Sequence, residues 1–286
     1  MIPVSLRAFP IAAACALALA GPAGAADAPA GEGAIPNFAA DVATSWALDQ
    51  TIDDLLPPPS GAGPITFDPA HPYIPNFRGT QPTYRVADLS NPILQPWARE
   101  QMRKSNAQVL AGKVPFRARE RCWPIGVPGF AIYSLVEPFY FYQTPEKVTI
   151  INPGGPEVRH IYLNVPHSAD PKPSWYGESV GHYEGGDTLV IDTIGISDKT
   201  FVDNYRTPHT SKLHVVERLK LVDGGKAVQI SMTVDDPGAF TMPWSATQRW
   251  RRVAPGPITE GPCNENNTDH FNHSLIPTPM ADKPEF

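Results

Sequence analysis

Proline content is the feature that most limits the folds open to this chain. The 286 residues include 34 prolines, and an interior proline removes a helix hydrogen bond and clashes with the preceding turn. Long uninterrupted helices are therefore not expected, which excludes coiled coils, helical bundles and multispan membrane proteins. Residues 26–90 are rich in Pro, Gly and Ala, and the run PPPSGAGP is typical of a semi-rigid linker or surface wrap.

The first 25 residues have the pattern of a secretory signal peptide. Arg7 supplies a positive charge, IAAACALALA an apolar stretch too short to span a bilayer, and Ala23-Gly24-Ala25 a cleavage site. We expect cleavage after Ala25 and a periplasmic or secreted protein. No other segment is long and apolar enough to predict a membrane span.

Charge and cysteine content bear on two further properties, which are nucleic-acid binding and disulfide formation. The 23 basic and 29 acidic residues give a net charge of −6 without basic runs, which argues against nucleic-acid binding. Cleavage removes Cys15 and leaves Cys122 and Cys263. In an oxidising compartment these two are expected to form a disulfide.

The chain divides into four expected parts. They are a signal peptide (1–25), a Pro-rich N-terminal extension (26–121), a β-domain (122–253) and a C-terminal strap (254–286). Within the extension, a short helix is possible around residues 46–56. A better one is predicted near residues 96–111, because proline suits a first helical turn and Gly112 can end the helix.

From Cys122 onward the pattern predicts strands joined by short turns. The clearest hairpin is LHVVERLKLV, the turn DGGK and AVQISMTV, in which Val228, Ile230, Met232 and Val234 share one face. Successive hairpins favour an antiparallel meander, and a closed barrel removes exposed sheet edges. We therefore predict a mainly β fold with a lipocalin-like barrel, an N-terminal wrap and one short helix. A β-sandwich is the alternative.

Two carboxylates interrupt strand rows that are otherwise apolar. Alternation along LHVVERLKLV places Glu217 in one row with Leu213, Val215, Leu219 and Leu221. In DTLVIDTIGI, Asp192 shares a row with Val190 and Ile194. Both acids are therefore expected on the inner face of the sheet.

An inward carboxylate has two interpretations. If these rows line a barrel interior, each acid must be paired or neutralised, because burial disfavours the charged form. A carboxyl with a raised pKa suits acid–base catalysis near neutral pH. The alternative is that each acid pairs with an arginine or caps a turn at the barrel mouth.

Histidines precede both of these strands. His182 lies before the Asp192 strand and His209 before the Glu217 strand, so the four side chains could meet at one rim of the barrel. We predict His182, His209, Asp192 and Glu217 as a catalytic cluster. The residues predicted to line or support a pocket are Trp175, Tyr176, Tyr183, Asp203, Tyr205, Arg218 and Trp244.

The metal-binding pattern is weak. His182, His209, His214 and Glu217 could bind a metal only if a bulge intervened, because His214 and Glu217 have opposite strand parity. No cofactor is therefore predicted.

A nucleophile motif is present without its usual context. The stretch 177–181 fits G-x-S-x-G. Its flanks lack the strand–turn–helix arrangement that exposes such a serine, so Ser179 is interpreted as a loop serine.

Three strings carry a family resemblance: WYGESVGHYEGGDTLVIDT, LHVVERLKLVD and TVDDPGAFTMPW. They resemble signatures of a large, mostly uncharacterised family of secreted bacterial β-rich proteins. Tyr183 stands where tryptophan is commoner in that family, and Gly186 lengthens the turn by one residue. The resemblance implies that residues 175–192 and 203–218 form one shared site or structural knot.

These observations lead to three functional hypotheses. The first is a cofactor-independent acid–base enzyme, preferably a lyase, with an isomerase or hydrolase also possible, that acts on a small apolar or aromatic molecule in a barrel pocket. The second is a non-catalytic periplasmic barrel that binds a hydrophobic ligand. The third is a structural envelope protein. The sequence does not predict the oligomeric state.

Overall fold

The structure is a computed structural model that describes residues 35–39, 45–49, 53–73, 85–113, 122–132, 138–155 and 157–254. The predicted signal peptide and all but the first residue of the predicted C-terminal strap lie outside these residues. Cys263 also lies outside them, so its predicted bond to Cys122 stays a prediction.

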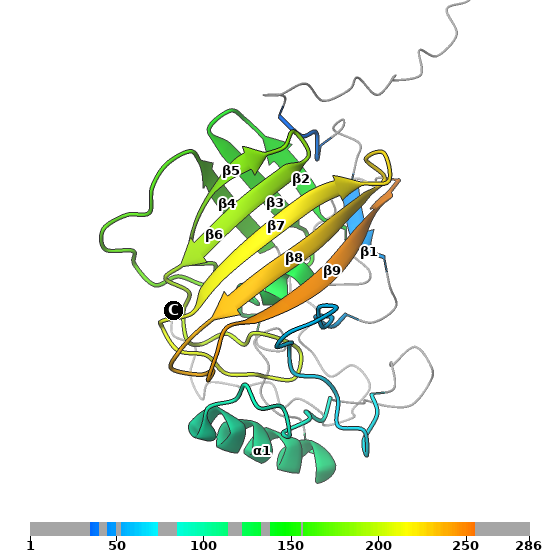
Figure 1. Ribbon diagram of the computed structural model, residues 1–286, viewed down its shortest axis with the longest axis vertical. Helices are drawn as coiled ribbons and strands as arrows, with labels where there is room; N and C mark the ends of the chain where they lie inside the picture. The colour runs from blue at the N-terminus through cyan, green and yellow to red at the C-terminus, as the bar shows by residue number, and fades with distance from the viewer. Residues whose placement is uncertain are drawn as a thin grey trace, which may run out of the picture.

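In the described residues, nine strands form one sheet that curls into a nearly closed barrel (Figure 1). Their order in the sheet is β1-β9-β8-β7-β6-β5-β4-β3-β2. The strands are β1 (Ser45–Leu48), β2 (Tyr140–Gln143), β3 (Lys147–Asn152), β4 (Glu157–Leu163), β5 (Glu178–Glu184), β6 (Thr188–Ile194), β7 (His214–Val222), β8 (Ala227–Asp235) and β9 (Trp244–Val253). The predicted β-barrel class is confirmed.

The first strand brings the two edges of the sheet together. β1 pairs along β9, and Trp46 also exchanges two backbone hydrogen bonds with Phe139, next to β2, at 2.9 and 2.7 Å. This bridge satisfies backbone groups that an open edge would expose. The short helix considered around residues 46–56 is wrong for residues 46–49 and 53–56, because pairing with β9 outweighs local preference.

One junction departs from an antiparallel meander. β4 and β5 are parallel, with Ile161 opposite Ser179. The connection between them, residues 164–177, contains Pro166, Pro171 and Pro173 and is too long for a tight turn. We call this connection the pocket loop.

Apolar side chains fill the barrel interior around β8 and β9. The predicted inner row of β8, which is Val228, Ile230, Met232 and Val234, is buried. Trp250 stacks on the Phe139 ring with centroids 4.3 Å apart. This part of the interior is thus a packed core rather than a hollow.

The N-terminal extension contributes β1 to the barrel wall, and its helix lies at one end of the barrel (Figure 1). Its helix α1 (Pro96–Leu110) buries Ala98 and Met102, and it occupies the range that the sequence predicts. Asn106 exchanges two hydrogen bonds of 2.9 Å with the backbone of Ala87, which joins the helix to the segment that precedes it. None of the helices in the described part of the chain is long and apolar enough to cross a bilayer.

Candidate functional site

Glu217 points into the barrel, as its row predicts, but it does so as one half of an ion pair. Its Oε2 lies 2.5 Å from a terminal nitrogen of Arg159 on β4, and both residues are at most 2% exposed. The same Arg159 nitrogen donates to Thr193 Oγ1 at 2.9 Å. Glu217 is therefore compensated by an arginine, which is the second of the two interpretations of an inward acid.

Ser179 belongs to this interior network and not to a loop. It lies in β5, is buried, and its hydroxyl is 2.9 Å from Thr193 Oγ1. The loop interpretation is wrong because glycine interrupts the apolar pattern of this strand. A Cβ at Gly181 would lie 2.6 Å from the carbonyl oxygen of Val190, so this close approach requires glycine.

Asp192 faces outward, which corrects the predicted inward row. The inner row of β6 is Leu189, Ile191 and Thr193, all buried. β6 is apolar on both faces over much of its length, so alternation alone does not identify the inner one. The Asp192 side chain is 39% exposed.

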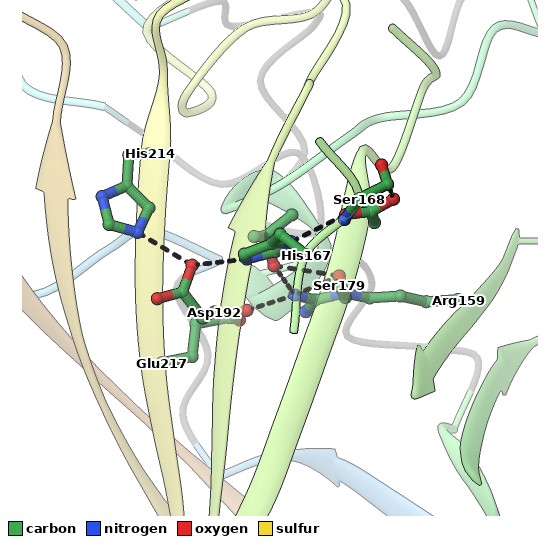
Figure 2. A network of polar contacts seen from close by, with 9 residues as sticks. Arg159, His167, Ser168, Ser179, Asp192, His214 and Glu217 are labelled. Carbon is green, nitrogen blue, oxygen red and sulfur yellow. Dashed lines mark hydrogen bonds and ion pairs between the residues drawn. The ribbon is translucent and has the colours of Figure 1, made fainter. Parts of the chain in front are cut away.

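Two histidines contact Asp192 on the outer surface. Its Oδ1 lies 3.0 Å from Nε2 of His167, in the pocket loop, and 2.9 Å from Nε2 of His214, on β7. Figure 2 shows Asp192 between the two rings. His167 also contacts Glu178, with Nδ1 2.9 Å from Oε1. Ser168 donates to Glu178 through its backbone amide at 2.8 Å and its hydroxyl at 2.6 Å.

These bonds set the charge state of Glu178. The pKa of its carboxyl is lowered, first by the Ser168 hydroxyl and then by the Ser168 amide, because both stabilise the ionised form. The outer network therefore contains a carboxylate that is fixed by hydrogen bonds at the start of β5.

The predicted catalytic cluster does not form. His182 is on the outer surface and its Nε2 lies 2.9 Å from Glu184. His209 is buried, with Nε2 2.8 Å from Thr200 Oγ1, and burial lowers the pKa of its imidazole. His182 lies within β5 and points outward, whereas His209 lies in the segment before β7 and is buried, so the two rings do not share a rim.

Asp203 and Tyr205 lie in a buried network of hydrogen bonds and ion pairs. Burial raises the pKa of Asp203 to about 6, and its carboxylate accepts hydrogen bonds from Thr207 and from the amide of Tyr205. The Tyr205 hydroxyl donates to Asp54 at 2.9 Å, and Asp54 pairs with Arg85 at 2.7 Å. This network connects the N-terminal extension to the segment that precedes β7.

Trp175 and Tyr183, two of the predicted pocket aromatics, contact side chains outside the predicted cluster. Trp175 lies against Trp123, with ring centroids 5.4 Å apart. The Tyr183 hydroxyl accepts a hydrogen bond from Gln143. Neither residue joins the predicted cluster.

The remaining predicted pocket residues are also dispersed. Arg218 pairs with Glu184 on the surface, and Trp244 is part of the core. Of the pocket residues that the sequence predicted, Tyr176 alone lines the pocket described next.

A pocket of about 480 Å³ lies between the outer face of β4, the start of β5 and the pocket loop. His160 Nδ1, on its β4 side, is 3.1 Å from Thr149 Oγ1. Sequence reasoning missed this site because it depends on where a proline-rich loop returns to the sheet. The lining includes Val158, His160, Tyr162, Ser168, Lys172, Tyr176 and Glu178.

In the described part of the chain, no group of three or more His, Cys, Asp or Glu side chains is placed to hold a metal ion. No protein-family model, curated protein or solved structure matches the chain. The family resemblance of its motifs therefore stays a prediction.

Proposed function

We propose that the protein is exported and binds a small ring compound with hydroxyl groups in the pocket between β4 and the pocket loop. The observation that carries this proposal is the pocket itself, in which Tyr162 and Tyr176 stand beside His160, Ser168 and Glu178. Its volume lies within the range of about 300–1,000 Å³ that is common for ligand sites.

The charges around the pocket favour a neutral ligand. Lys172 pairs with Asp170 in the pocket loop. Glu178 already accepts bonds from Ser168 and contacts His167. A ligand with aromatic or hydroxylated rings would contact the tyrosines without needing a countercharge.

Acid–base catalysis is the second candidate, and His160 favours it. Thr149 contacts Nδ1 of this ring, so Nε2 is the nitrogen that a ligand could use for proton transfer. The ionised Glu178 would stabilise positive charge nearby. Elimination or isomerisation fits better than attack by Ser179, whose hydroxyl is bonded inside the barrel.

Binding is tested by titrating a panel of phenols and monosaccharides while following heat release. Tyr162→Ala should weaken binding about tenfold, the effect of losing roughly 1.4 kcal/mol of ring contact. Tyr142→Ala is the matched control, because Tyr142 is similarly exposed but does not line the pocket. Equal losses in both variants, or no binding by any compound, would overturn the proposal.

Catalysis is tested with the compounds that bind. His160→Gln should abolish turnover while the dissociation constant changes by less than about threefold, because the ring would act on the proton and not on affinity. Unchanged turnover in His160→Gln contradicts the catalytic candidate and leaves binding alone.

Export and the disulfide are tested on protein recovered from the producing cell. Amino-terminal sequencing should begin at Ala26, and thiol titration of the unfolded, unreduced protein should find no free cysteine. A mature chain that begins at Met1, or two titratable thiols, would contradict these proposals.

A further inference from the structure

His167 occupies an unusual position between two carboxylates. Its Nδ1 faces Glu178 at 2.9 Å and its Nε2 faces Asp192 at 3.0 Å. Ionised carboxylates only accept hydrogen bonds, so both contacts are made in full only when both ring nitrogens carry protons. A neutral ring has one N–H and would turn a lone pair toward one of the carboxylates.

The two contacts connect the pocket loop to two strands of the sheet. His167 and Ser168 belong to the loop, Glu178 begins β5, and Asp192 lies on β6. The loop is also held near its ends, where the amide of Asn164 donates to the carbonyl of Gly181 and that of Ser174 to Gly195. Between these anchors, His167 and Ser168 attach the loop to the sheet.

Several other charged groups on this face of the sheet are paired, and the titratable His160 of β4 contacts Thr149. On β7, His214 contacts Asp192, and Arg218 pairs with Glu184 of β5. The outward His182 of β5 also contacts Glu184. In the loop itself, Lys172 pairs with Asp170. His214 is thus the titratable group that shares a carboxylate with His167.

From this geometry we infer that His167 is a protonation-dependent latch that holds the pocket loop against β5 and β6. The inference rests on the proposed function only for its consequence, which is that ligand access changes with pH. In the imidazolium form the latch is closed, and loss of one proton releases one of the two carboxylates. Histidine is the side chain whose charge ordinarily changes between pH 5 and 8.

The latch is tested without a ligand by measuring exchange of the Ser168 amide proton by NMR at pH 5.5 and 8.5, corrected for the intrinsic rate. This amide donates to Glu178, so its protection reports on the latch. Protection should fall about tenfold at the higher pH in the wild-type protein, since a hydrogen bond to a charged group is lost. It should be low at both pH values in His167→Ala.

For Asp192→Asn we expect the opposite of the result for His167→Ala. The Asn amide can donate to a neutral His167 nitrogen, so the loop should stay protected at both pH values. His182→Gln is the control, because His182 pairs with Glu184 outside this network. Protection that does not change with pH in the wild-type protein, or that changes equally in Asp192→Asn, overturns the latch.

A ligand measurement separates the latch from the proposed function. If Ser168 protection follows pH as expected but no compound binds, the latch stands and the proposed function fails. If a compound binds with the same affinity at both pH values in the wild type and in His167→Ala, the inferred control of access is wrong.

Discussion

Removing the charge of Glu217 should be among the most damaging conservative changes in this protein. Arg159 and Glu217 are both almost fully buried and 2.5 Å apart. In Glu217→Gln, Arg159 would keep uncharged partners, such as the hydroxyl of Thr193, in place of its carboxylate. Breaking a buried pair by removing one partner costs about 3–5 kcal/mol, because the remaining charge stays desolvated.

The assay is urea unfolding followed by the fluorescence of the buried tryptophans. Glu184→Gln is the matched control, since Glu184 and Arg218 form a pair of the same type that is 40% and 48% exposed. It should cost less than about 1 kcal/mol. Replacing both buried partners, as Arg159→Met with Glu217→Leu, should cost much less than the sum of the single changes.

Two results would refute this reasoning. The first is a loss below about 1 kcal/mol in Glu217→Gln, which would mean that the interior solvates the arginine. The second is strict additivity in the double variant, which would mean that the two side chains do not interact. Either result would also reopen a catalytic role for Glu217.

Three further predictions concern buried positions. Burial raises the pKa of Asp203 from 3.8 to about 6 in the folded protein. The folded state therefore favours the protonated carboxyl, whose contribution to stability is fully present below about pH 4 and is lost as pH rises through about 6. The change in the free energy of unfolding is about 3 kcal/mol. Asp203→Asn should remove this dependence in unfolding titrations, and an unchanged slope would contradict it. His209 has a lowered pKa when folded, so its contribution is present above about pH 6.5 and is lost as pH falls. Unfolding at pH 7.5 and 5.5 should show a smaller acid loss in His209→Asn than in the wild type. Gly181→Ala places a methyl group against the Val190 carbonyl and should lower the melting temperature by several degrees, and an unchanged melting temperature would contradict the close approach.

Local alternation predicts the β7–β8 hairpin and β9 well. These strands have one apolar and one polar face over most of their length, so side-chain period and burial agree. Alternation does not identify the inner face of β5, because that face carries Ser179 and Gly181 in place of large apolar residues. The predicted face of Asp192 is wrong because β6 is apolar on both sides.

The candidate site could not be predicted from local patterns. Arg159 and Glu217 are 58 residues apart, and nothing near either residue identifies its partner. His167 lies in a proline-rich loop without periodicity, and its contacts depend on how β5 returns parallel to β4. Long-range pairing decides both networks.

The pairing of β1 with β9 has a consequence for how the molecule is made. Ser45 pairs with Val253, so β1, the first of the described strands to leave the ribosome, gains its full-length partner only when β9, the last of them, has been made. Until then, Trp46 and its neighbours remain an unsatisfied strand that other chains can capture. Assembly of the cylinder is therefore a late event with a large loop-closure cost, and a protein truncated before β9 should remain open and prone to aggregate.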